Sequence, residues 1–326
     1  MQQEIARRGS SLIERRTFLS SSIAVGAGAI MPWRTNAQPE GSPAADEDQP
    51  KPFTLRFAPH FGMFRNSAGN DPAEQLRFAA AQGFTAWEYP GMGAEPASMQ
   101  ETMAKSMADL GLAMGVFTVS PATTWGPHFV LGKTDSREKF LTDCKKAVES
   151  AKRVNATWMI VVPGTRVPNI EMGYQTSNVV EQLRYAADIF EKHELVMVIE
   201  PRNPWHDQPN MFLSTVPQAY EVCRAVDSPA CKILYNIYHQ QIAGGNLIPN
   251  IDLAWEEIAY FRIGDTPGRF EPGTGEINYT NVLSAISDKG YKGIFGMDHS
   301  NSKPGKAGEQ AVIKAYRKID VARNTK

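Results

Sequence analysis

From residue 53 onward, short apolar runs alternate with longer segments of helical period, and this alternation limits the possible folds more than any other feature. The runs expected to form strands are 54–58, 85–89, 113–119, 157–162, 196–200, 232–237, 258–263 and 293–297. Apolar strands that alternate with helices are typical of a parallel sheet covered by helices. Eight such units in about 275 residues predict a (β/α)8 TIM barrel of the α/β class.

Amphipathic patterns support the helices between these runs. The spacing predicts helices over 72–82, 98–110, 215–226, 279–289 and 308–324, and apolar residues share one helical face over 140–151 and 179–190. The segment between the sixth and seventh runs has the weakest helical pattern. No glycine-rich dinucleotide-binding fingerprint follows the first run, which disfavours an open doubly wound sheet.

The N-terminal region has the pattern of an export signal. Arg15 and Arg16 precede a mildly apolar run, 20–31, which is too short to span a bilayer as a mature helix. This pattern, followed by small residues at 35–37, is typical of a bacterial Tat signal, and a disordered basic terminus is the alternative. We therefore expect a signal peptide over 1–37, export to the periplasm, and the Tat export machinery as a partner.

Two further regions complete the domain organisation. Residues 38–52 are rich in proline and acidic residues and are expected to form a disordered linker. Residues 53–326 are expected to form the barrel as a catalytic domain. The formal net charge of −1 gives no electrostatic basis for binding nucleic acid or an anionic membrane, so a small-molecule substrate is the expected partner of the mature protein. The sequence does not indicate an oligomeric state.

The three cysteines have no metal-ligand spacing. Cys223 and Cys231 would be the pair to form a disulfide in an oxidising periplasm, because a helix end and the following strand can bring them together. Three buried free thiols, including Cys144, are the preferred interpretation.

Polar side chains stand at the C-terminal ends of six expected strands. They are His60, Glu88, Glu200, Asn236 with His239 beyond it, Arg262, and Asp298 with His299 beyond it. A TIM barrel places its active site at these ends, so we expect one shared pocket rather than six solvated caps. The alternative for His60, Glu88 and His299 is a structural role at the barrel rim.

A dense polar loop, 264–276, follows the seventh strand and combines several glycines with Pro267 and Pro272. Glycine supplies positive φ and proline fixes φ near −65°, so this composition demands a specific backbone. We expect a built loop that directs Arg269 toward a ligand, and an ordered surface loop without a ligand is the alternative.

Segments 199–203, 235–241 and 263–278 together resemble the hydroxypyruvate isomerase family, within the wider group of xylose-isomerase-like barrels that includes ketose epimerases and endonuclease IV. The resemblance extends over residues 55–299. It implies one divalent metal, Mg²⁺ or Mn²⁺, held at the ends of strands five to eight by four side chains, which are a Glu, an Asp, a His or Gln, and a second Glu. It also implies two glutamates that move a proton between adjacent carbons. The four metal-ligand positions correspond in this sequence to Glu200, Asn236, Arg262 and Asp298.

This sequence departs from the ligand pattern that the resemblance implies. Glu200 is unchanged, Asn236 can offer a carbonyl oxygen, and Asp298 keeps a carboxylate on a shorter side chain. Arg262 cannot bind a metal, because a guanidinium has no acceptor and stays protonated. Glu200, Asp298 and Arg262 together carry the net charge of three carboxylates with a dication. We therefore hypothesise that Arg262 replaces the cation, either by pairing with the carboxylates or by binding a substrate oxygen.

The chemistry implied by the resemblance is proton transfer through an enediolate, which needs a base, an acid and stabilisation of an oxyanion. Glu200 and Asp298 are the expected acid–base pair, facing each other across the barrel mouth. Burial and mutual repulsion are expected to raise the pKa of one of them, and Arg262 is expected to oppose that rise. The expected substrate-binding side chains are His60, Glu88, His239, Arg262 and Arg269.

The resulting expectation is a hydroxypyruvate-isomerase-like enzyme, an isomerase of the intramolecular oxidoreductase type, acting on a small hydroxycarbonyl compound or keto-sugar. One alternative is a sugar epimerase or lyase of the same barrel family, in which Trp125 and Trp205 stack on a sugar ring. Another is a non-catalytic periplasmic binding protein. Six scattered histidines and a net charge of −1 disfavour the endonuclease branch.

Overall fold

The computed structural model describes residues 50–120 and 126–320. The predicted signal peptide, nearly all of the predicted linker, and Trp125 lie outside the described residues. Among the residues that are described, no helix has both the length and the apolar character needed to cross a membrane.

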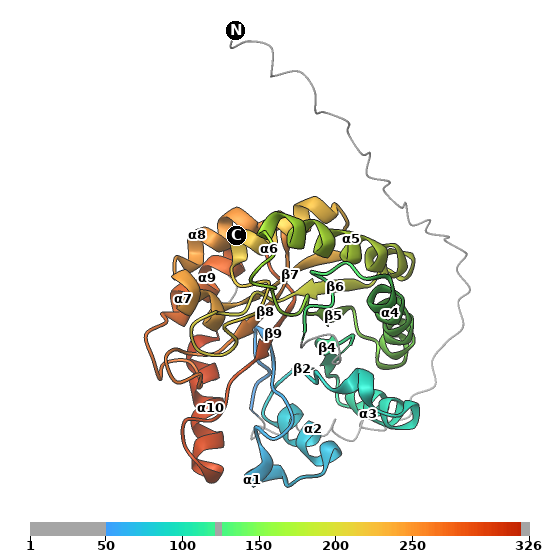
Figure 1. The fold of residues 1–326 in the computed structure, drawn as a ribbon. Helices are drawn as coiled ribbons and strands as arrows, with labels where there is room; N and C mark the ends of the chain where they lie inside the picture. The colour runs from blue at the N-terminus through green and yellow to red at the C-terminus, as the bar shows by residue number, and fades with distance from the viewer. Residues whose placement is uncertain (1–49, 121–125, 321–326) are drawn as a thin grey trace, which may run out of the picture. The chain divides into compact units, whose positions relative to one another are not determined.

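The described strands form a parallel barrel surrounded by helices (Figure 1). They are β1 (Arg56–Ala58), β2 (Ala86–Trp87), β3 (Ala113–Met114), β4 (Phe117–Thr118), β5 (Trp158–Val161), β6 (Val196–Ile199), β7 (Cys231–Asn236), β8 (Ile258–Ile263) and β9 (Ile294–Met297). One sheet has the order β1-β9-β8-β7-β6-β5-β4, and β2 pairs with β3. A parallel bridge between His60 and Glu88 joins the ends of β1 and β2.

The single third strand expected over 113–119 is wrong. The chain instead forms β3, which pairs with β2, and β4, which pairs with β5. Gly115 lies between them, and a Cβ atom there would come within 2.7 Å of the Tyr260 hydroxyl. The backbone changes its pairing partner where it passes this hydroxyl. The other expected strands agree with the structure to within two residues at each end, so the predicted (β/α)8 architecture is confirmed.

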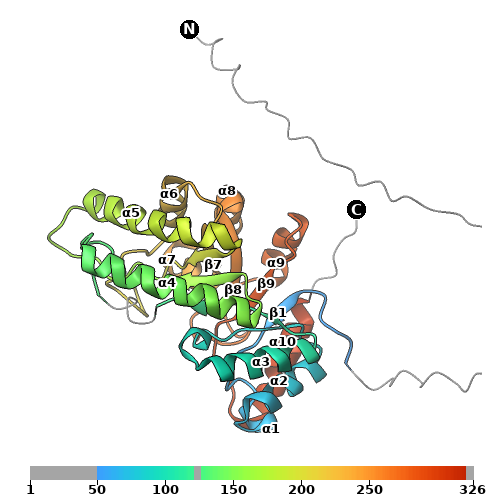
Figure 2. The same ribbon diagram turned by 90° about the vertical axis from the view of Figure 1, so that its right-hand side faces the viewer.

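The helices form a ring outside the barrel, and Figure 2 shows α4 and α5 side by side along the strands. The α-helices are α1 (Arg65–Ala68), α2 (Pro72–Ala81), α3 (Ala97–Asp109), α4 (Thr134–Val154), α5 (Met172–Phe190), α6 (Val216–Val226), α7 (Ile237–Gly244), α8 (Leu247–Ala254), α9 (Tyr279–Asp288) and α10 (Gly305–Ile319). Short 3-10 helices are η1 (Met92–Ala94), η3 (Glu191–His193) and η4 (Trp255–Glu257). Two short helices, α7 and α8, fill the segment with the weak pattern, and α10 begins three residues earlier than expected.

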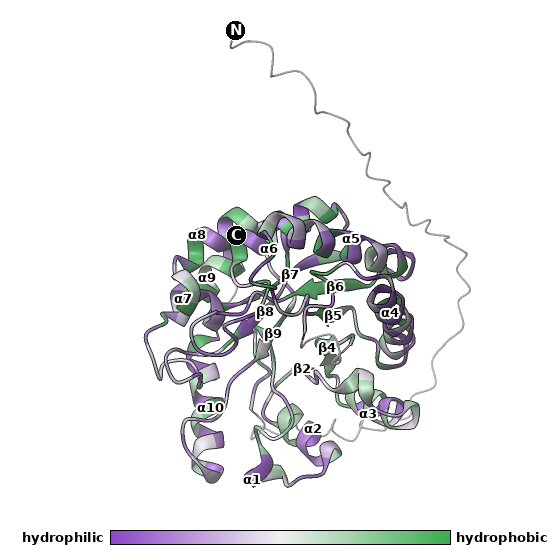
Figure 3. Ribbon diagram, viewed as in Figure 1, coloured by the Kyte–Doolittle hydropathy of each residue, from purple (hydrophilic) through white to green (hydrophobic). Residues whose placement is uncertain are grey.

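Side-chain alternation along the strands decides what lies inside the barrel. On β8, Phe261 belongs to the apolar layer under the helices, whereas Tyr260 belongs to a smaller apolar cluster inside the barrel. On β7, Tyr235 and Leu234 divide in the same way. In Figure 3, the apolar strand β6 is coloured green, whereas the outer helix α4 is largely purple. Continuing this period of two toward the C-terminal end of β8 turns Arg262 inward.

The three cysteines are buried free thiols, as the preferred interpretation expected. Cys223 lies on α6 and Cys231 on β7, and this helix and this strand contact each other. No disulfide joins them in the structure.

Candidate active site

Asn236, at the C-terminal end of β7, connects the two carboxylates that the sequence singled out. Its Nδ2 donates to Glu200 Oε1 at 2.9 Å and to Asp298 Oδ2 at 2.8 Å. Glu200 and Asp298 therefore do not face each other across an open mouth, as expected, but are neighbours bridged by one amide. An oxygen of each carboxylate lies within 4.8 Å of the other, so one small substrate can reach both.

Arg262 holds the deep side of this cluster. Its Nη1 donates to both oxygens of Glu200 at 3.1 and 3.2 Å, and its Nη2 donates to Glu88. The Tyr260 hydroxyl donates to the second oxygen of Glu88 at 3.0 Å. The side chains of Arg262, Glu88 and Glu200 are no more than 5% exposed. Two carboxylates and one guanidinium thus form a buried ionic network, in which Arg262 and Glu88 contact each other rather than solvent.

The neighbouring strand leaves room for this network. Gly296 lies on β9, in register with Arg262, and a Cβ atom there would come within 2.0 Å of Glu88 Oε2. Because that atom belongs to a carboxylate already held by two donors, a side chain at this position would force the network apart. Gly296 is therefore a structural requirement of the pair between Glu88 and Arg262.

The outer side of the cluster is reachable from solvent. Asp298 accepts a hydrogen bond from Arg269 Nη2, and the side chains of these two residues are 24% and 31% exposed. Arg269 Nε also donates to the Asp298 carbonyl at 3.2 Å, and its guanidinium lies 4.9 Å from the centre of the Tyr238 ring. A ligand that enters from solvent meets Asp298 and Arg269 before it meets Glu200.

The loop that carries Arg269 is built around one buried carboxylate. Asp265 accepts hydrogen bonds from the backbone N–H groups of Thr266, Gly273, Gly275 and Ile277. A Cβ atom at Gly275 would lie 1.9 Å from the Thr266 carbonyl oxygen, so this position requires glycine. The sequence correctly indicated an ordered loop, and the structure shows that it delivers Arg269 to Asp298.

His239, in the first turn of α7, is fixed as a single tautomer. Asn203 Oδ1 accepts from the backbone N–H groups of Trp205 and His206, which turns Asn203 Nδ2 toward His239 Nδ1 at 2.9 Å. The Asn203 backbone N–H also points at Nδ1, at 3.3 Å. Nδ1 is therefore an acceptor, and the neutral ring carries its proton on Nε2. Burial lowers the pKa of His239 to about 4, so the ring is neutral at pH 7.

This environment leads to a prediction about His239. We expect its ring to stay neutral, with the proton on Nε2, between about pH 5 and 8, because protonation requires a pH near the lowered pKa. Long-range ¹H–¹⁵N spectra, with the signal assigned through His239→Gln, measure this directly. Asn203→Ala is the matched control, since it removes the donor that fixes the tautomer. A titration of His239 within this pH range in the unmodified protein would contradict the assignment.

The carboxyl pKa values differ from the expectation that Glu200 or Asp298 would be raised. Burial raises the pKa of Glu88, and its partner Arg262 offsets this only in part. Burial acts on Glu200 in the same direction, but Arg262 and Arg202 outweigh it and lower the pKa to about 2. The pKa of Asp298 is also lowered, because Arg262 and Arg269 outweigh burial. Glu200 and Asp298 are each next to two arginines, whereas Glu88 contacts only one.

Two predicted residues have structural contacts at the rim. The ring nitrogens of His60 lie 2.9 Å from the Phe61 carbonyl and 3.2 Å from the His299 carbonyl. His299 Nε2 lies 2.8 Å from the Tyr316 hydroxyl, and burial lowers the pKa of His299 to about 4. The ring of His60, which was predicted to bind substrate, thus contacts two backbone carbonyl groups of the rim, and the ring of His299 contacts the Ser300 carbonyl and the Tyr316 hydroxyl.

Three contacts of the cluster were missed by sequence reasoning. Tyr260 is two residues before Arg262 on the same strand, so the period of two could have indicated it. Arg202 donates to Glu200 at 3.2 Å, and Asp207 pairs with Arg269 at 3.5 Å. Both lie in the irregular segment after β6, where no periodic signal exists.

A metal ion is implied by the family resemblance, and the spacing of some residues would accommodate one. Glu200, His239 and Asp298 each offer a ligand atom, and these atoms lie within 4.8 Å of one another. Their hydrogen bonds do not fit this use. Nδ1 of His239 accepts from Asn203, which leaves the ring proton on Nε2, so neither ring nitrogen has a free lone pair for a metal. Nδ2 of Asn236 lies between the two carboxylates, and its Oδ1 accepts from the backbone N–H of His239. In this arrangement, the carboxylate oxygens are placed to accept hydrogen bonds from guanidinium and amide side chains rather than to bind a metal.

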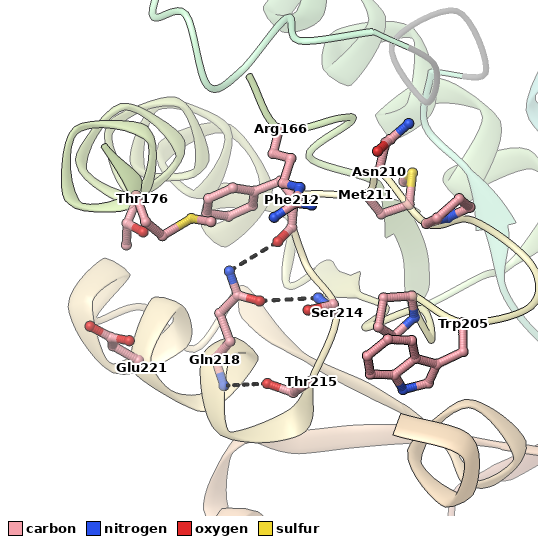
Figure 4. Close-up of a pocket in the computed structure, with 13 residues that line it drawn as sticks. Arg166, Thr176, Trp205, Asn210, Met211, Phe212, Ser214, Thr215, Gln218 and Glu221 are labelled. Atoms are coloured by element: carbon pink, nitrogen blue, oxygen red, sulfur yellow. Dashed lines mark hydrogen bonds between the residues drawn. The ribbon is translucent and has the colours of Figure 1, made fainter. Parts of the chain in front are cut away.

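A second hollow, of about 660 Å³, lies along α5, α6 and the segment after β6 (Figure 4). Trp205 stands at one side of it with 71% of its surface exposed, and Arg166 stands at another. Gln218 fixes the wall by donating to the Phe212 carbonyl and accepting from the Ser214 N–H, both at 3.0 Å. The described residues that line this hollow do not include the carboxylates of the cluster.

The fold and the cluster define a (β/α)8 barrel with an ionisable site at the carboxyl ends of its strands, a class that contains many enzymes. Within this class, the chain belongs to the xylose isomerase-like TIM barrel family, whose sequence model matches residues 76–319. This match confirms the wider group indicated by the sequence.

Individual relatives agree with this placement. A 2-oxo-tetronate isomerase from Pectobacterium atrosepticum is 29% identical over 231 residues, covering 70% of this chain and 86% of the relative. A hydroxypyruvate isomerase from Escherichia coli is 36% identical over 132 residues, covering 40% of this chain and 51% of the relative. A family 2 AP endonuclease from Brucella melitensis has a similar fold, with a TM-score of 0.68 and 22% identity over 78% of this chain and 96% of that chain. The two curated relatives are isomerases, so isomerase is the class they support rather than oxidoreductase.

Proposed function

We propose that the protein is a hydroxypyruvate-isomerase-like enzyme that moves a proton between adjacent carbons of a small hydroxycarbonyl or keto-sugar substrate. The observation that carries this proposal is the pair of carboxylates, Glu200 and Asp298, bridged by Asn236 at 2.9 and 2.8 Å. Two carboxylates at this separation can serve neighbouring carbons of one substrate. The isomerase relatives support the same class of reaction.

Asp298 is the side chain placed to begin the reaction, because it is partly exposed and Glu200 is buried. Substrate oxygens that bind Arg269 would take donors away from Asp298. The pKa of Asp298 would then rise from its lowered value toward that of a useful base. Asp298 takes a proton from one carbon to give an enediolate and returns it to the adjacent carbon. The hydroxyl proton of the substrate meanwhile passes to the former carbonyl oxygen by way of the ionised Glu200 carboxylate.

Donors beside the carboxylates stabilise the charge that develops on the substrate oxygens. Arg269 contributes a guanidinium at the exposed side. His239 contributes Nε2–H, because Asn203 occupies its Nδ1. Fixed donors aimed at a developing oxyanion are among the largest contributions to catalysis. The lowered pKa of His239 keeps the ring neutral, and the hydrogen bond at Nδ1 leaves its single proton on Nε2.

The test is the exchange of carbon-bound hydrogen with solvent. Purified protein is incubated in D₂O with hydroxypyruvate and a panel of short hydroxyaldehydes and ketoses, and deuterium is located by NMR. Deuterium at the carbon next to the carbonyl, with formation of the isomer, supports the proposal. Binding of a panel member without exchange or turnover would instead support the alternative of a binding protein.

A second candidate function is a sugar epimerase or lyase, favoured by the hollow beside Trp205. An exposed indole next to a cavity of this size can stack on a sugar ring. The same D₂O experiment distinguishes the candidates. An epimerase returns deuterium to the carbon from which the proton was removed, and a lyase eliminates water.

We further propose that the protein is exported by the Tat pathway, because Arg15 and Arg16 precede an apolar run in the first 37 residues. Arg15→Lys combined with Arg16→Lys is expected to keep the protein in the cytoplasm. Cell fractionation followed by immunoblotting measures the change. The sequence provides a matched control, Arg7→Lys with Arg8→Lys, which alters a second arginine pair and should leave export intact. Export of the first variant would disprove the assignment.

A further inference from the structure

We propose that Arg262 is a built-in cation that replaces the divalent metal of this barrel family, and that Glu88 and Tyr260 form the seat that holds it. The inference concerns the same site as the proposed function and deepens it by making proton transfer independent of metal. It rests on the contacts around Arg262, which exist whatever the substrate is.

The contacts of Arg262 are those expected of a cation between carboxylates. Nη1 donates to both oxygens of Glu200 and Nη2 donates to Glu88, while Nε has no hydrogen-bond partner among the described residues. The charge of Arg262 also lowers the pKa of Asp298. One buried guanidinium therefore acts on three carboxylates, as a dication at the centre of the cluster would.

The seat is specific to an arginine at this position. Glu88 lies at the end of β2, is buried, and accepts from both Arg262 and Tyr260, so it has no oxygen left without a donor. The barrel makes room for these side chains at two glycines, Gly296 beside Glu88 and Gly115 beside the Tyr260 hydroxyl. Four residues from separate parts of the barrel thus support one guanidinium. A buried charge needs such compensation, and an arginine without Glu88 would remain unpaired on one side.

Arg262 also prevents the nearby carboxylates from binding a metal. Glu200 receives hydrogen bonds from Arg262, Arg202 and Asn236, so its lone pairs are already occupied. A dication placed beside Glu200 would add two positive charges to a position where a guanidinium already lies within 3.2 Å of both oxygens. We therefore expect the cluster to exclude Mg²⁺ and Mn²⁺ while Arg262 is present.

The experiment measures metal binding, which does not depend on any activity. Full-length protein is purified without chelators and analysed for metal by mass spectrometry. It is then titrated with Mn²⁺ at pH 7 while free Mn²⁺ is followed by electron paramagnetic resonance. The unmodified protein is expected to bind no Mn²⁺ at the cluster. Arg262→Gln removes the charge and supplies an amide oxygen beside Glu200 and Asp298, so it is expected to bind one Mn²⁺ per chain.

Two further variants keep the result interpretable. Arg202→Gln removes a different arginine from Glu200 and should gain no Mn²⁺ site, since Arg262 is still present. Glu88→Gln with Arg262→Gln removes the buried pair as a whole, which avoids an unpaired Glu88, and it should gain Mn²⁺ even where Arg262→Gln alone fails to fold. Stoichiometric metal in the unmodified protein overturns the inference, as does folded Arg262→Gln protein that binds no Mn²⁺. Failure of the D₂O exchange would count against the proposed function alone.

Discussion

Asp298→Asn is expected to lower the rate of solvent hydrogen exchange and of turnover by about 10² to 10⁴, the contribution typical of a positioned acid or base. Asparagine keeps the shape of the side chain, and its oxygen can still accept from Asn236 and Arg269, as the Asp298 carboxylate does. It cannot take a proton from carbon. Because the fold is preserved, the loss should appear in kcat more than in KM. Single-turnover measurements of deuterium incorporation give the value.

The chain offers a matched control for this experiment. Glu257 is another buried carboxylate, paired with Lys232 at 2.7 Å and with Arg224 at 3.3 Å, but it precedes β8 and so lies at the opposite end of that strand from Arg262. Glu257→Gln should reduce stability without changing hydrogen exchange. If Asp298→Asn retains full exchange while remaining folded, Asp298 is not the base and the proposed mechanism is wrong.

Much of the candidate site could be predicted because strand periodicity and barrel topology act together. Glu200, Asn236 and Arg262 each end an apolar run, and parallel strands bring such ends to one rim. Local sequence was therefore enough to place these three side chains in one cluster. The break at Gly115 was not predictable from local sequence, because the group that this glycine faces, the Tyr260 hydroxyl, lies on a strand that is distant in sequence.

The pairing inside the cluster could not be predicted from local sequence either. Whether Arg262 binds a substrate or another side chain depends on Glu88, which lies 174 positions earlier in the chain. The direction of each pKa shift depends in turn on how many arginines surround each carboxylate. The irregular segment after β6 supplies Arg202 and Asp207 to the cluster, and sequence patterns carry no information on where such a segment points.

Removing the charge of Arg262 should have the largest effect on stability. Arg262→Met leaves Glu88 and Glu200 buried without their shared cation, and breaking a buried pair in this way costs about 3 to 5 kcal/mol of unfolding free energy. Arg202 still contacts Glu200, so Glu88 bears most of the loss. Denaturant unfolding at pH 8 measures the difference from the unmodified protein.

The pH dependence distinguishes a charge effect from a packing defect. Burial raises the pKa of Glu88 even with Arg262 present, and without Arg262 that pKa rises further above the unfolded value of about 4.3. The loss of unfolding free energy is then largest above the folded-state pKa. It becomes smaller as the pH falls through that pKa, because at low pH the carboxyl group is protonated in both the folded and the unfolded state. We therefore expect Arg262→Met to be less destabilising at pH 5 than at pH 8, and Glu88→Gln added to it to recover part of the loss at pH 8.

Lys232→Met serves as the control for this variant, since it breaks the pair with Glu257 at the other end of the barrel. The Lys232 side chain is 23% exposed, and Arg224 remains beside Glu257, so a loss of about 1 kcal/mol is expected. A loss for Arg262→Met that is equal at pH 5 and pH 8, and that Glu88→Gln does not reduce, would show that Arg262 stabilises the barrel by packing. The role of Arg262 as the cation of the site would then lose its energetic basis, because a cation between buried carboxylates must be held by their charge.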